Sequence, residues 1–99
     1  MIFSDWRRLT ENEVRMAKQV FADSIDFHHI KIYRGIPLIP NANTAIAPNG
    51  NIYFPRKHCP DDFTQAGIAY KIWLIHELTH VWQHQRGHKV WLSGLFIML

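Results

Sequence analysis

The chain has almost no cysteine and no long apolar run. Cys59 is the single cysteine among 99 residues, so no internal disulfide can form and the sequence indicates no redox compartment. No apolar stretch approaches the roughly 20 residues that a membrane-spanning helix needs. The first eight residues lack the charged start and apolar run of a secretory signal. These absences predict a soluble chain without a membrane span, made in the cytoplasm, and leave export by a signal-independent route open.

Clustered positive charge is also absent. The formal net charge is +3 at pH 7 and the sequence pI is about 9.3, but the basic residues are scattered along the chain. A nucleic-acid interface needs Lys and Arg gathered on one face. We therefore expect no nucleic-acid partner.

Apolar and aromatic residues, by contrast, are plentiful. The composition is 47% hydrophobic with four Trp and six Phe, which is enough for a globular core and argues against disorder. The length predicts one domain over residues 1–99. The segment from Val90 to Leu99 is mostly apolar and carries no charge. Two interpretations of it stay open: a last segment packed on the core, or a domain that continues in the native protein and is truncated here.

The first half of the chain predicts a helix and then a strand. Residues 10–23 read as a helix because Thr10 and Glu13 form a capping box, which satisfies free backbone donors at a helix start. Residues 29–34 form a short β-prone run. Because two prolines follow closely, we expect this strand near an edge of its sheet.

The second half predicts a hairpin and a long helix. Asn49-Gly50 lies between the apolar runs 44–47 and 51–54, and both residues tolerate the positive φ of a tight turn. Residues 65–86 read as a largely buried helix that Gly87 ends in the left-handed conformation. Its expected apolar face is Ile68, Ile72, Ile75 and Trp82, broadened by Trp73, Leu74, Leu78 and Val81. The predicted fold class is α+β: an N-terminal helix, a small sheet with a hairpin, and the long helix packed across it.

The long helix contains the pattern His76-Glu77-Leu78-Thr79-His80. Residues four apart share one helix face, so two imidazoles can converge on one metal ion. Glu77 lies next to the first ligand and can reach a metal-bound water whose pKa the metal lowers to about 7. The pattern therefore predicts zinc held by His76 and His80, with Glu77 as the general acid/base of hydrolysis.

A catalytic zinc normally takes three protein ligands, and the third is open. No Asp or Glu follows Glu77. His88 ranks first within the chain, because Gly87 can turn the backbone toward the metal, whereas His84 is too far along a straight helix. A ligand removed by truncation is an equal alternative. The other candidates precede the helix and can fold over the site: His58, Cys59, Asp61 and Asp62.

Two segments resemble a known family. They are Thr44 to Phe54, which includes the strand "NIYFP", and Leu74 to Gln85, which includes "HELTHVWQHQ". Over roughly residues 9–92 the chain resembles bacterial zincin-like metallopeptidase domains that accompany Vgr and Rhs proteins of type VI secretion and related contractile injection systems. The resemblance implies His76 and His80 as zinc ligands, Glu77 as catalytic acid/base, and a role as an antibacterial effector or effector-associated domain. Related zincins commonly take their third ligand from a glutamate well downstream.

Three hypotheses of function follow. The leading one is a zinc metallopeptidase that acts on a protein or peptide substrate, with an immunity or secretion-system protein as a further partner. The second is a catalytically inactive zincin-like binding or adaptor module of a secretion complex. The third is a structural zinc site with a closed shell of four ligands that includes His84 or His88.

Overall fold

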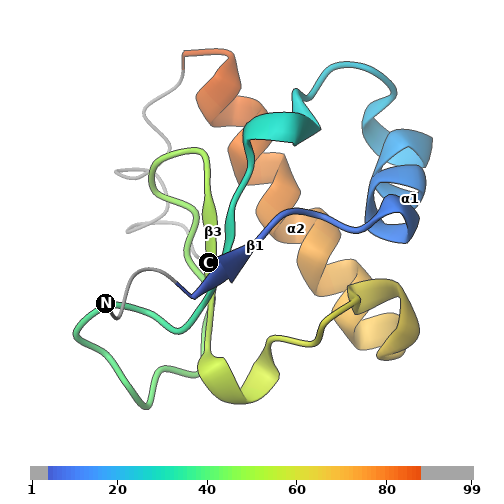
Figure 1. Ribbon diagram of the computed structural model, residues 1–99. Coiled ribbons are helices and arrows are strands. Elements are labelled where there is room, and N and C mark those ends of the chain that lie inside the picture. The colour runs from blue at the N-terminus through green and yellow to red at the C-terminus, as the bar shows by residue number, and fades with distance from the viewer. Residues whose placement is uncertain (1–4, 88–99) are drawn as a thin grey trace.

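Within the part of the chain that the structure describes, two helices and a small sheet confirm the predicted α+β class (Figure 1). A computed structural model describes residues 5–87, so His88 and the segment Val90 to Leu99 lie outside the described residues. No helix within that part is long and apolar enough to cross a membrane. The elements are β1 (Trp6–Arg7), α1 (Glu11–Phe21), β2 (Ile32–Arg34), β3 (Ile52–Phe54) and α2 (Ile68–Gln85), with short 3-10 turns at Phe27–His29, Arg56–His58 and Phe63–Gln65.

Helix α1 begins at the predicted capping box. The Glu13 amide donates to Thr10 Oγ1 at 3.1 Å, and the Thr10 amide donates to Glu13 Oε1 at 2.9 Å. The helix ends at Phe21, two residues before the predicted end, where Ala22 takes a positive φ of 52°. The start was predictable because a side-chain motif defines it, whereas no such motif marked the end.

The sheet has the order β1-β2-β3, which corrects the predicted edge position of the first strand. β2 is the central strand: it pairs antiparallel with β1 and parallel with β3, with Ile32 opposite Ile52. Both prolines lie beyond Arg34, the last residue of β2, so neither removes a ladder donor. The partner β1 is only two residues long and carried no recognisable strand pattern.

The predicted hairpin is confirmed only at one residue pair. Ile46 and Tyr53 exchange two antiparallel backbone hydrogen bonds of 3.1 and 2.9 Å, and no longer ladder follows among the described residues. Between them, the Asn51 side chain accepts from the Lys31 amide, and the Asn51 amide donates to Asn49 Oδ1. These side-chain bonds compete with an extended ladder and widen the turn into a loop.

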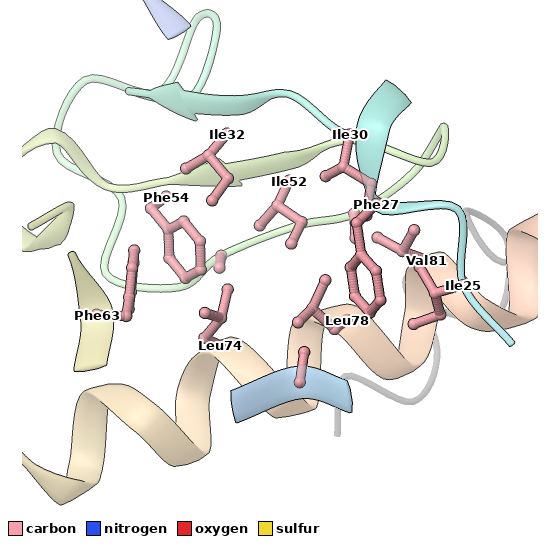
Figure 2. Close-up of a cluster of buried hydrophobic side chains, with 13 residues drawn as sticks. Ile25, Phe27, Ile30, Ile32, Ile52, Phe54, Phe63, Leu74, Leu78 and Val81 are labelled. Atoms are coloured by element: carbon pink, nitrogen blue, oxygen red, sulfur yellow. The ribbon is translucent and has the colours of Figure 1, made fainter. Parts of the chain in front are cut away.

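The core lies between the sheet and α2. Figure 2 shows Leu74, Leu78 and Val81 of α2 pointing toward Ile32, Ile52 and Phe54 of the strands. All six side chains are fully buried. This packing fixes the rotation of α2 about its own axis, and with it the direction of every other side chain on the helix.

The predicted buried face of α2 was partly wrong. Ile68 and Ile72 are 69% and 62% exposed, whereas the buried stripe is Leu74, Leu78 and Val81. Apolar residues occupy several sides of this helix, so their spacing alone could not choose which side meets the sheet. Gly87 does have the predicted left-handed conformation, with φ +86°.

Cys59 is expected to react slowly as long as the protein is folded. Burial raises the pKa of its thiol to about 11, from a reference of 9.0. Only the thiolate is nucleophilic, so two pKa units predict alkylation about 100-fold slower at pH 8 than in the urea-unfolded chain. Iodoacetamide labelling followed by mass spectrometry measures both rates, and equal rates would contradict this prediction.

Candidate metal centre

The side chains of His76, Glu77 and His80 on helix α2 differ in how far they are buried. Successive residues are about 100° apart around a helix, so the two histidines lie well away from the buried stripe and Glu77 lies on its flank. The exposed fractions agree: the His76 side chain is 53% exposed and that of Glu77 is 6% exposed. The motif therefore presents one imidazole to solvent beside one covered carboxyl group.

The two imidazoles of the motif lie next to each other. Their ring centroids are 5.1 Å apart and the ring planes are nearly perpendicular, at 88°. His76 Nε2 lies 3.9 Å from Glu77 Oε2, which is too long for a hydrogen bond but close enough for the two groups to act on one bound species. This is the juxtaposition that the sequence spacing predicted for His76, Glu77 and His80.

Burial shifts the pKa values of two groups in the motif, Glu77 and His76. Burial raises the pKa of Glu77 to about 7, from 4.5, which suits proton transfer near neutral pH. Burial, and then the neighbouring charge of His80, lower the pKa of His76. A lowered pKa favours the neutral imidazole, the form that binds a metal.

Gln83 contacts the second histidine of the motif, a contact that the sequence interpretation missed. Its Oε1 lies 3.1 Å from His80 Nδ1. An amide oxygen accepts, so Nδ1 is the nitrogen that donates to it, and Nε2 lies on the side of the ring away from Gln83. The sequence could have indicated this contact, because His80 and Gln83 are three residues apart and such residues are neighbours on a helix.

Among the described residues, no third candidate ligand joins His76 and His80. Across residues 5–87, no group of three or more His, Cys, Asp or Glu side chains is close enough together to hold an ion. His88, the first-ranked third ligand, lies outside this range. Two adjacent imidazoles beside a carboxyl group fit part of a zinc site, whose usual protein complement is three ligands.

The remaining candidate ligands are engaged elsewhere in the fold. His84, which would have joined a structural site, packs close to Gly50, where an added Cβ would lie 2.7 Å from the ring. The other four have these partners: His58 with Tyr70 Oη, Cys59 with the Tyr33 carbonyl, Asp61 with Arg34, and Asp62 with the Thr64 amide. Within residues 5–87, none of these four residues joins His76 and His80 in a group that could hold an ion.

Comparison with known proteins identifies a relative. No protein-family model matches the chain. Over 93 residues it is 39% identical to the type VI secretion system spike protein VgrG2b of Pseudomonas aeruginosa. The solved effector domain of that protein superposes with a TM-score of 0.82 at 37% identity, over 93% of this chain. The chain is a homologue of the VgrG2b effector domain.

The match covers the relatives only in part. The chain spans 52% of the solved VgrG2b effector domain and 9% of the whole spike protein. The homology confirms the predicted relation to Vgr proteins of type VI secretion. It extends over most of this chain and therefore includes both the sheet and the motif helix.

Proposed function

We propose that the domain is a zinc-dependent peptidase that acts as a type VI secretion effector. The observation that carries the proposal is the pair of adjacent imidazoles, His76 and His80, with the covered carboxyl group of Glu77 beside them. Homology to an effector domain of a spike protein supports delivery by the same kind of system. A protein or peptide is the proposed substrate, and an immunity protein is a proposed partner.

Four residues of α2 have different proposed roles. His76 and His80 would hold the zinc, which when bound supplies a Lewis acid and lowers the pKa of a water to about 7. Glu77 is placed to take a proton and return it to the leaving amine. Gln83 orients the His80 ring, so that its free nitrogen faces the site.

A measurement of zinc affinity tests whether His76 and His80 are the zinc ligands. The His80→Ala variant removes one of the two imidazoles, so we expect zinc affinity to fall about 100-fold or more, measured by isothermal titration of the metal-free chain. The matched control is His84→Ala, one turn further along α2, where the ring contacts Gly50 instead of the site. Equal loss of zinc in both variants would contradict the assignment.

A second function is favoured by one specific observation. Within the described part of the chain only two metal-binding side chains converge, one fewer than a catalytic zinc usually needs. This favours an adaptor module that keeps the fold without the chemistry. Casein hydrolysis with and without added zinc separates the two: absence of cleavage by a zinc-loaded chain would support the adaptor.

A further inference from the structure

A polar cavity opens at the C-terminal end of α2. It has a volume of about 600 Å³, which is within the range of cavities that hold a ligand. Three segments surround it: the turn at Phe27–His29, the loop before β3 and the end of α2 (Figure 1). The side chains that line it are those of Asp26, His29, Asn49, Asn51, His84 and Gln85.

This cavity begins one helical turn from the metal centre. His84 follows His80 by four residues, which keeps it on the same side of α2 and about 6 Å further along the axis. The His84 ring packs against Gly50, where an added Cβ would lie 2.7 Å from it. An extended peptide that is bound at the motif and runs toward the end of α2 therefore reaches the cavity within about two residues.

Hydrogen bonds hold the walls of the cavity together. The Gln85 side chain accepts from the Asp26 amide at 2.8 Å and donates to the Asp26 carbonyl at 3.0 Å, which joins the end of α2 to the segment before β2. Asn51 Oδ1 accepts from the Lys31 amide at 2.9 Å and joins the loop before β3 to the same segment. A ligand therefore meets walls that are already in place, and binding loses little affinity to ordering them.

The lining of the cavity favours a cation over an apolar or anionic group. Its described residues include no aliphatic side chain, so an apolar side chain of a substrate would bury little apolar surface there. Asp26 is the one carboxylate of the lining, which contains neither Lys nor Arg. The hydrogen bond from His29, with 2.6 Å between Nδ1 and Oδ2, lowers the pKa of Asp26 and keeps it ionised at neutral pH. The Asp26 side chain is still 52% exposed, so a cation can reach it.

We propose that this cavity binds a basic side chain, lysine or arginine, of the protein substrate close to the bond that is cleaved. The ammonium or guanidinium group pairs with the Asp26 carboxylate, and the surrounding amide and imidazole groups replace part of its water. The proposal rests on the proposed peptidase function and narrows its class of substrate.

Nuclear magnetic resonance of the metal-free 99-residue chain tests the cavity without catalysis. The probes are Nα-acetyl-lysine methylamide and Nα-acetyl-norleucine methylamide, which share an aliphatic stem and differ in the terminal ammonium group. We expect only the lysine probe to shift the amide resonances of Gly50 and Gln85. Its dissociation constant should rise about fivefold in Asp26→Asn, the effect of losing one partly exposed ion pair.

Two further variants make this result specific. Asp23→Asn is the same change at a carboxylate that is 95% exposed and outside the cavity, so it should bind the lysine probe as the wild type does. Asn49→Asp adds a second carboxylate to the lining and should lower the dissociation constant, which tests the cavity even if Asp26→Asn folds poorly.

Cleavage of casein tests whether the cavity serves the substrate. Mass spectrometry of the fragments made by the zinc-loaded chain should show Lys or Arg enriched at one position within about two residues of the cut bond. The enrichment should be lost in Asp26→Asn and kept in Asp23→Asn. Equal binding of both probes, a lysine affinity that Asp26→Asn does not change, or cut sites without a basic preference would overturn the proposal. A chain that binds the lysine probe but cleaves no peptide would support the cation site and contradict the peptidase.

Discussion

Casein hydrolysis by the Glu77→Gln variant is expected to fall by a factor of about 10² to 10⁴, with zinc binding retained. Glutamine has nearly the shape of glutamate but cannot accept and release a proton at neutral pH. Glu77 is almost fully buried against the core side of α2, so an isosteric side chain should keep the helix and both imidazoles in place. The loss would therefore report proton transfer and not misfolding.

Two measurements make this result specific. Zinc content, determined on the same samples, should be equal in the wild type and Glu77→Gln, because Glu77 is not a proposed ligand. The control variant is Glu11→Gln, an identical change at an exposed position in the first turn of α1, which should keep full activity. Hydrolysis by Glu77→Gln at the wild-type rate would refute the role of Glu77, whatever the metal content.

Replacing Glu13 by alanine is expected to destabilise the domain by about 3–5 kcal/mol. The side chain is fully buried and accepts from the Thr10 amide at 2.9 Å, from the Phe63 amide at 2.8 Å and from both terminal nitrogens of Arg7 at 2.8 and 2.9 Å. One carboxylate thus joins β1, the start of α1 and the turn that precedes α2. Its removal leaves the Arg7 guanidinium, largely buried, without its counter-charge.

Urea unfolding followed by circular dichroism measures this loss. Glu11→Ala removes an exposed carboxylate from the same helical turn and should change the free energy of unfolding by no more than about 0.5 kcal/mol. A similar small change for Glu13→Ala would show that the buried hydrogen bonds contribute far less than their geometry suggests.

Part of the candidate site could be predicted because it depends on helical spacing alone. Residues four apart share a face on any α-helix, so His76 and His80 meet regardless of what surrounds them. The burial of Glu77, and hence its raised pKa, was not predictable, since it depends on which side of α2 faces the sheet. The positions of His58 and Asp61 likewise depend on partners distant in the chain, Tyr70 and Arg34.

The sequence by itself determined the local features: the capping box at Thr10, the left-handed Gly87, and the one-turn spacing within the motif. Each depends on contacts within a few residues, so the side chains involved are enough to specify it. Only the tertiary structure decided that β2 is central, that β3 joins it in parallel, and that Leu74 and not Ile72 faces the core. Several faces of these elements are apolar and similar in composition, so the sequence does not show which face is buried. The buried face is decided by the surface that packs against it, and that surface forms only in the folded chain.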